Sequence, residues 1–194
     1  MKTAIAKASK LTIAALVALA MLVSLCACGG KSSEEVIREG VSADFETIKN
    51  FKDNPSSEIL GNLSDMADLE QFGIDGNEFF TIWFDGFDYQ IDEITIQGDS
   101  ATVKVTLTIK SFEDALNRFT EEINKLQYDE EYIGLAEEEI YKKLGPILLD
   151  CIKQAPLFSP TVELPYVLKD GTWTPGSDFS KLLTEAIYGD MLNG

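Results

Sequence analysis

The residue types that most often carry chemistry in proteins are sparse in this sequence. The chain of 194 residues has no histidine, which removes the commonest general base and a frequent metal ligand at neutral pH. Serine triads and histidine-containing zinc sites are therefore excluded. Cys151 lies in an apolar run typical of a helix, with no histidine to activate it, so we interpret it as a buried structural thiol.

Acidic side chains are the remaining candidates for chemistry, as ligands for a cation. Two runs stand out, Asp129-Glu130-Glu131 and Glu137-Glu138-Glu139. Neither has the spacing of a calcium-binding loop, and Asp75-Gly76-Asn77 is too short to form one. We interpret both runs as solvated surface, and the sequence predicts no metal site and no cofactor.

The other two cysteines, Cys26 and Cys28, stand at the end of a segment with the layout of a secretory signal. Residues 1–10 carry three lysines and no acid, and residues 11–25 (LTIAALVALAMLVSL) are uncharged and apolar. We call residues 1–27 the leader, residues 28–33 a flexible tether, and residues 34–194 a single domain.

The run Leu25-Cys26-Ala27-Cys28 resembles a bacterial lipobox, although Cys26 stands where alanine, serine or threonine is commoner. The resemblance implies cleavage before Cys28 and attachment of diacylglycerol to its thiol, with palmitate among the acyl chains. Two acyl chains would hold the protein firmly on the extracytoplasmic face of the membrane. The alternative is an uncleaved membrane helix, because residues 11–30 approach the length that a bilayer requires.

Charge limits the partners of the chain that remains after cleavage. Removing the three leader lysines from 16 basic residues leaves 13 against 33 acidic residues, a formal charge of −20. Nucleic acid and anionic lipid headgroups would meet like charge, so neither is an expected partner. The lipid on Cys28 is the expected contact with the membrane.

Helical periodicity marks most of the chain. Apolar residues recur at helical spacing over residues 34–52, 112–126 and 135–151, and a closing helix follows residue 177. Ser111 and Asp114 have the spacing of a capping box. A weaker pattern over residues 59–69 suggests another helix, and Gly145-Pro146 is expected to kink or split the helix that contains it.

Strand signals are confined to two hairpins. Residues 101–110 alternate apolar and polar side chains, with Lys104 and Lys110 on the polar face. The preceding strand needs a bulge near Asp92 to keep its apolar residues on one face. A second hairpin turns at Asp170-Gly171, and Pro165 places its strand at an edge or a bulge. The order of elements predicts an α+β fold with helices on one face of an antiparallel sheet.

An aromatic set is the candidate binding site, because apolar cavities with a few polar tips hold small molecules. The same rings could instead fill the core between helix and sheet. The candidate ligand-binding residues are Phe80, Trp83, Phe84, Phe87, Tyr89, Tyr166 and Trp173.

Residues 84–91 (FDGFDYQI), 94–105 (ITIQGDSATVKV) and 168–173 (LKDGTW) resemble uncharacterised NTF2-like (cystatin-like) lipoproteins of bacteria. The resemblance implies a curved antiparallel sheet wrapped by helices into a cone, which holds a small ligand in some relatives. The helical insertion over residues 112–155, between the two hairpins, departs from a minimal version of that fold.

The expected function is therefore a non-enzymatic lipoprotein of the cell envelope that binds a small apolar ligand or another envelope protein. The alternative comes from enzymes of the NTF2-like superfamily that use an aspartate base and a tyrosine donor. In this chain Asp85 or Asp88 would be the base and Tyr89 the donor, provided that the carboxylate is desolvated.

Overall fold

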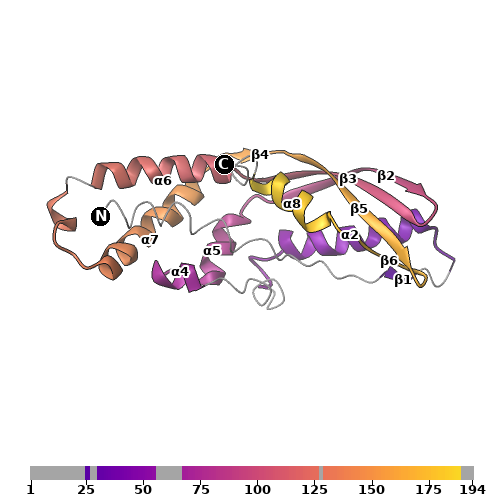
Figure 1. Ribbon diagram of the computed structural model, residues 1–194, viewed down its shortest axis with the longest axis horizontal. Coiled ribbons are helices and arrows are strands. Elements are labelled where there is room, and N and C mark those ends of the chain that lie inside the picture. The colour runs from indigo at the N-terminus through magenta and orange to yellow at the C-terminus, as the bar shows by residue number, and fades with distance from the viewer. Residues whose placement is uncertain (1–24, 27–29, 56–66, 127–128, 189–194) are drawn as a thin grey trace.

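The computed structural model describes residues 25–26, 30–55, 67–126 and 129–188 (Figure 1). The elements in chain order are β1 (Leu25–Cys26), α2 (Ser33–Lys49), α4 (Ala67–Gln71), α5 (Gly76–Trp83), β2 (Asp88–Gln97), β3 (Ser100–Lys110), α6 (Phe112–Leu126), a 3₁₀ turn (Glu130–Tyr132), α7 (Glu137–Gln154), β4 (Leu157–Phe158), β5 (Thr161–Lys169), β6 (Thr172–Pro175) and α8 (Phe179–Tyr188).

The strands form one antiparallel sheet in the order β1-β6-β5-β3-β2, with β4 paired to the end of β3. Both predicted hairpins are present, as β2–β3 and β5–β6. The register of β2 against β3 shifts between Ile91 and Glu93, which confirms the predicted bulge. Because of this extra residue, the apolar side chains before and after it face the same side of the sheet.

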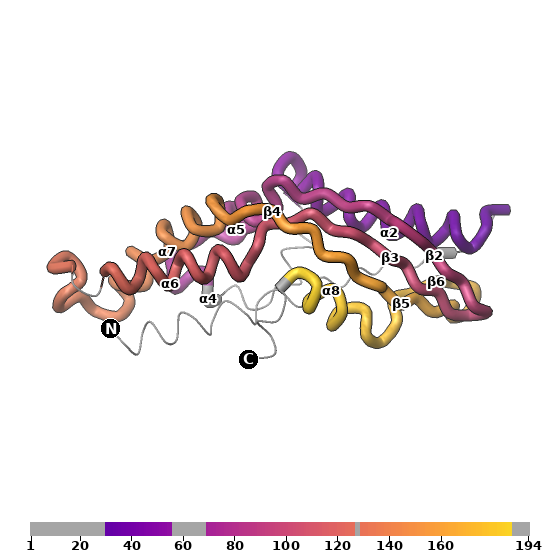
Figure 2. Tube along the Cα trace, turned by 90° about the horizontal axis from the view of Figure 1, so that it is seen from above, coloured from indigo at the N-terminus to yellow at the C-terminus, as the bar shows by residue number. Residues whose placement is uncertain are grey.

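Only one face of the sheet is covered. Along β3, Val103, Val105 and Leu107 are fully buried, whereas the alternate residues Thr102 and Lys104 are exposed. Helix α2 lies along β2 and helix α8 along β5, so the curved sheet arches over both (Figures 1 and 2). The predicted α+β fold, with a curved antiparallel sheet and helices on one face, is confirmed and is consistent with an NTF2-like cone.

The helical insertion is a hairpin of α6 and α7 that extends from the sheet, at the opposite end of the elongated molecule from β1 and β6 (Figure 1). The backbone N–H of Asp114 donates to Ser111 Oγ at 3.2 Å, as the predicted cap requires. Helix α7 runs without a break through Gly145 and Pro146, so of the kink or split expected there, the split does not occur. Gly145 packs against the carbonyl of Phe72, which joins α7 to the chain just after α4.

The predicted exposure of Lys110 is also wrong, because the alternating pattern of β3 placed its side chain on the solvent face. Its side chain is buried, and Nζ donates a hydrogen bond to the Lys153 carbonyl oxygen at 3.1 Å. Lys153 belongs to the last turn of α7, where carbonyl groups lack partners within the helix. The cation therefore caps α7, a contact that links residues 43 positions apart.

The short strand β1 was not predicted, because Leu25 and Cys26 were assigned to the leader. In the structure Leu25 lies opposite Trp173 and Cys26 opposite Thr172, at the outer edge of β6. The rest of the leader, Cys28, and most of the weakly predicted helix over residues 59–69 lie outside the described residues. None of the helices within the described residues has both the length and the apolar character needed to cross a membrane.

Candidate functional site

Five of the seven candidate aromatic residues lie together, because α5 and the start of β2 are adjacent in the chain. All of these rings except that of Trp83 pack against Phe45 of α2 or Phe51 just beyond it. Phe51 is edge-on to Phe80 at 6.0 Å between centroids, and Phe45 is 5.2 Å from Tyr89. The five are Phe80, Trp83, Phe84, Phe87 and Tyr89. The apolar spacing of residues 34–52 indicated the buried face of α2, although not its contact with these rings.

The packing of this group favours a core role over a ligand cavity. Phe80 and Trp83 are only 2% and 1% exposed, and Trp83 meets Phe112 of α6 edge-on at 5.0 Å. Each ring contacts another ring at a distance typical of core aromatic pairs. The group therefore joins α2, α5 and α6 to the sheet.

The other two candidates, Tyr166 and Trp173, lie on neighbouring strands β5 and β6. Tyr166 packs edge-on against Phe179 of α8 at 5.5 Å, and burial raises the pKa of its hydroxyl well above the usual value, with a further contribution from the negative charge of Asp44. Trp173 is 1% exposed, and its Nε1 is the buried side-chain polar atom of the described residues that has no hydrogen-bond partner.

The structure separates the seven candidates into these two groups. The second group has the feature that a binding site needs and the first group lacks, namely a buried donor without an acceptor. Buried polar groups in proteins are nearly always paired, so an unpaired indole N–H marks a place where a ligand or water oxygen would be stabilised. No feature of the sequence near Trp173 signals this orphaned donor.

The carboxylates of the enzymatic alternative are solvated. Asp85 is exposed, and Asp88 accepts hydrogen bonds from Lys49 Nζ at 2.8 Å and from the backbone N–H of Tyr89 at 2.9 Å. These contacts lower the pKa of Asp88, with the Lys49 hydrogen bond as the largest cause. A general base at neutral pH needs the opposite shift, so this geometry favours a structural role for Asp88.

Tyr89 is likewise engaged with α2. Its hydroxyl is 3.1 Å from Glu46 Oε1 and 3.3 Å from the Ser42 carbonyl oxygen, and it can donate to either. Burial is the largest cause of a raised pKa at this hydroxyl. The Tyr89 and Asp88 contacts together fasten the start of β2 to the last turns of α2.

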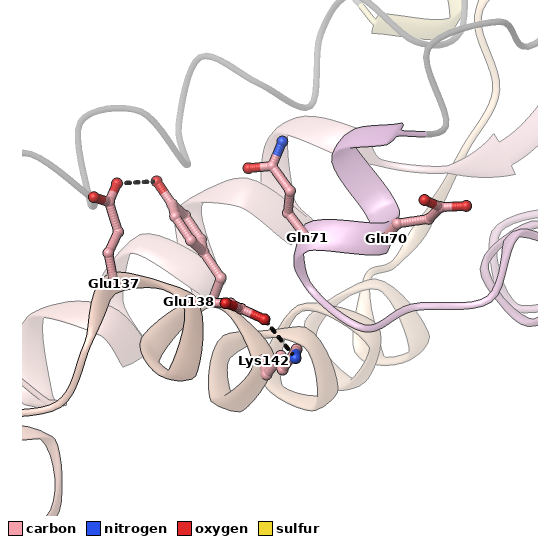
Figure 3. Close-up of a pocket in the computed structure, with 6 residues that line it drawn as sticks. Glu70, Gln71, Glu137, Glu138 and Lys142 are labelled. Atoms are coloured by element: carbon pink, nitrogen blue, oxygen red, sulfur yellow. Dashed lines mark hydrogen bonds and ion pairs between the residues drawn. The ribbon is translucent and has the colours of Figure 1, made fainter.

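A surface pocket of about 500 Å³ lies between α4 and α7. Its walls are Glu70, Gln71, Glu137, Glu138, Tyr141 and Lys142 (Figure 3). The Tyr141 hydroxyl donates to Glu137 at 3.3 Å, and Lys142 pairs with Glu138 at 2.8 Å. The Lys142 hydrogen bond lowers the pKa of Glu138, which favours the charged form of this carboxylate.

A second pocket, of about 350 Å³, lies between α6 and α7. It is lined by Arg118, Glu121, Glu122, Pro146, Ile147, Asp150, Cys151 and Gln154. Cys151 is 5% exposed, and burial raises the pKa of its thiol. The thiolate is therefore disfavoured, in agreement with the expected structural role. Within the described residues, no group of histidine, cysteine and carboxylate side chains is arranged to hold a metal ion.

These observations define the class as an α+β protein whose curved antiparallel sheet has one uncovered face. The hairpin of α6 and α7 extends from this sheet, and the surface pockets are lined in part by acidic residues. No protein-family model matches the chain, and no curated protein matches it either. The fold is similar to the crystal structure of YcdA from Bacillus subtilis, a protein proposed to be a lipoprotein, with 19% sequence identity and a TM-score of 0.48. The match covers 97% of this chain and 60% of YcdA.

Proposed function

We propose that the chain is a bacterial lipoprotein of the cell envelope, anchored through lipid on Cys28, with a non-enzymatic domain of the NTF2-like type. The lysine-led apolar leader and the run Leu25-Cys26-Ala27-Cys28 carry this proposal. The fold is compatible with it, because α2 begins only a few residues after Cys28. Ser32 caps that helix, and Glu35 completes the capping box, so the folded domain starts directly after a short tether.

The test of the anchor is metabolic labelling of the full chain with a palmitate analogue in a bacterial host. Wild type is expected to incorporate the label, and Cys28→Ala is expected to lose it and to keep residues 1–27. Cys26→Ala and Cys151→Ala are matched controls that should label normally. An intact Met1 in the mass of membrane-purified wild type, or unchanged labelling of Cys28→Ala, would contradict the proposal.

The domain itself is proposed to bind a small, largely apolar ligand that presents a hydrogen-bond acceptor to Trp173 Nε1. The supporting observation is the buried indole N–H without a partner, beside Tyr166 on the covered face of the sheet. The negative charge of Asp44 near Tyr166 favours a neutral acceptor such as a carbonyl over an anion. If the domain instead engages an envelope protein, the ligand contact at Trp173 is not required.

A thermal-shift screen distinguishes these two possibilities. A ligand that binds only the folded state at 100 times its Kd stabilises the fold by about 2.7 kcal/mol and raises the melting temperature. Sterols, lipids, peptides and cell-wall fragments are the classes to screen. Trp173→Phe keeps a ring but removes the donor, and it should reduce the shift of a true ligand. The same change at Trp83 is the control. A flat screen would rule against the ligand and leave the protein partner.

A further inference from the structure

The outer edge of β6 is covered by the end of the chain's own leader. Leu25 and Cys26 pair antiparallel with Trp173 and Thr172, so β1 is the outermost strand of the sheet beyond β6 (Figure 1). On its other side β6 pairs with β5 over Thr172 to Pro175. Strand β6 therefore has a partner on both sides only while Leu25 and Cys26 remain part of the protein.

Cleavage before Cys28, on which this inference rests as part of the proposed function, would remove Leu25 and Cys26. The N–H and C=O groups of β6 that face β1 would then lose their partners. A strand edge with unpaired backbone groups is a template for another extended chain. Proteins use such edges to bind peptides by adding a strand to the sheet.

We propose that leader removal opens the β6 edge, and that the mature protein binds there an extended, uncharged segment of a partner protein, paired antiparallel in the place of β1. The leader end shows the geometry that the edge accepts, with one residue opposite Trp173 and the next opposite Thr172. Alternate residues of β6 face opposite neighbours, so Thr172 and Thr174 pair with β5, and the outer edge offers the N–H and C=O of Trp173 and the C=O of Pro175, which lacks an N–H.

Charge argues for a separate segment rather than a second copy of the chain. Two mature copies would each carry a formal charge of −20, and α2, which contacts β1, begins with the exposed acids Glu34 and Glu35. Joining two such edges would bring like charges together. Strand β6 itself has no charged residue, so an uncharged segment meets no local repulsion.

The position of the edge also places the occupant near the membrane. After cleavage Cys28 stays joined to α2, which begins five residues later at Ser33, a chain reach of about 18 Å, and the start of α2 lies at the β6 end of the molecule (Figure 2). A lipid-bearing Cys28 would keep β6 at the membrane-proximal end of the molecule. The α6–α7 hairpin would be at the far end (Figure 1). The partner segment is therefore expected to lie close to the membrane surface.

The first measurement is hydrogen exchange of two full-length products purified from membranes, processed wild type and the unprocessed Cys28→Ala chain. Intact mass first establishes whether residues 1–27 are present in each. The amide of Trp173, which faces β1, should exchange at least about tenfold faster in the processed protein, whereas the amides of Thr172 and Thr174 face β5 and should be unchanged. Amides of β3 and β5 pair with each other in both products and serve as the internal control.

The second measurement is binding of a synthetic peptide with the sequence of residues 21–27 and serine in place of Cys26. It should bind processed protein at least about tenfold more tightly than the Cys28→Ala chain, and should slow the exchange of the Trp173 amide. A peptide with proline in place of Leu25 cannot donate from that position and should bind more weakly.

The outcomes separate the two proposals. If intact mass shows that wild type keeps residues 1–27, the lipoprotein proposal fails and the edge is never opened. If the leader is removed but the Trp173 amide exchanges as slowly as in Cys28→Ala, or the peptide does not bind, only the edge proposal is overturned. A processed dimer with a protected Trp173 amide would overturn the choice of occupant in favour of a second copy.

Discussion

At the scale of single residues, burial and charge assign roles that residue type leaves open. Asp88 is paired with Lys49 at the surface, and its pKa is lowered, so it is not poised as a base. Tyr166 is buried and its pKa is raised. Trp173 carries a buried donor without an acceptor. Among the candidate aromatics, Trp173 is therefore the one with a fully buried polar atom that has no partner in the described structure.

Tyr166 supplies a prediction about pH. Its folded-state pKa is raised, so the unfolded chain loses the phenolic proton near pH 10 while the folded protein keeps it. The unfolded state then binds fewer protons, and the free energy of unfolding falls as pH rises above about 10. The contribution of Tyr166 is fully present below that pH.

The measurement is the melting temperature of wild type and Tyr166→Phe between pH 8 and pH 11. Lysines with raised pKa values, such as Lys49, also lower stability in this range, but they do so equally in both proteins. The difference between the two melting temperatures should therefore shift in favour of Tyr166→Phe above about pH 10. Parallel curves across the whole range would contradict the assignment.

At the scale of elements, proline and glycine positions show how packing modifies local rules. Strand β5 lies inside the sheet, yet Pro165 is tolerated because β6 ends opposite Tyr166. The backbone N–H of Gly176 donates to the Pro165 carbonyl oxygen at 2.8 Å. The backbone nitrogen of Pro165, which has no hydrogen to donate, therefore lies just past the last residue pair of β5 and β6. The expectation that this strand lies at an edge or carries a bulge is therefore wrong, because β5 pairs with β3 on one side and β6 on the other without a register shift.

Gly145 supplies a prediction about α7. Replacing a glycine inside a helix with alanine normally stabilises it by about 0.5–1 kcal/mol. A Cβ on Gly145 would lie 2.1 Å from the Phe72 carbonyl oxygen, which is backbone and cannot move aside cheaply. We therefore expect Gly145→Ala to lower the free energy of unfolding by about 1–3 kcal/mol, as overpacking does in other cores.

Urea unfolding of Gly145→Ala checks this prediction. Lys142→Ala is the control in the same helix, because it removes only an exposed pair with Glu138. Such surface changes usually stay within about 0.5 kcal/mol. A Gly145→Ala protein more stable than wild type would show that the contact between α7 and Phe72 is not close.

At the scale of the whole molecule, the excess of acidic residues dominates the electrostatics. The full chain has a formal charge of −17, and the chain after Ala27 has −20. The ion pairs among the described residues have both side chains at least one third exposed, and several are local pairs within one helix. Exposed pairs contribute about 0–1 kcal/mol each, so we expect the repulsion between acidic side chains to outweigh them.

Salt is therefore expected to stabilise the protein. Raising ionic strength from about 0.01 M to 0.15 M shortens the screening length from about 30 Å to 8 Å, which weakens repulsion across the molecule. The melting temperature should rise over this range, to the same extent in NaCl and KCl. A falling melting temperature would mean that the surface ion pairs outweigh the net repulsion.

The sequence by itself determined the features that depend on neighbours along the chain. Period-two alternation set β3, and the change of phase at Asp92 set the bulge in β2. Ser111 set the start of α6. These follow from steric and hydrogen-bonding rules that act over a few residues. The order of such elements was enough to predict the α+β class.

Only the tertiary structure decided the features that join distant residues. In the tertiary structure Lys110 is buried against the end of α7, α7 continues without interruption past Pro146, and Leu25 lies beside Trp173. The tertiary structure also divides the aromatic candidates into a packed core group and a pair on β5 and β6. These outcomes depend on which surfaces meet when the helices and the sheet pack together. The free energy of this packing is summed over many long-range contacts, which no local sequence pattern encodes.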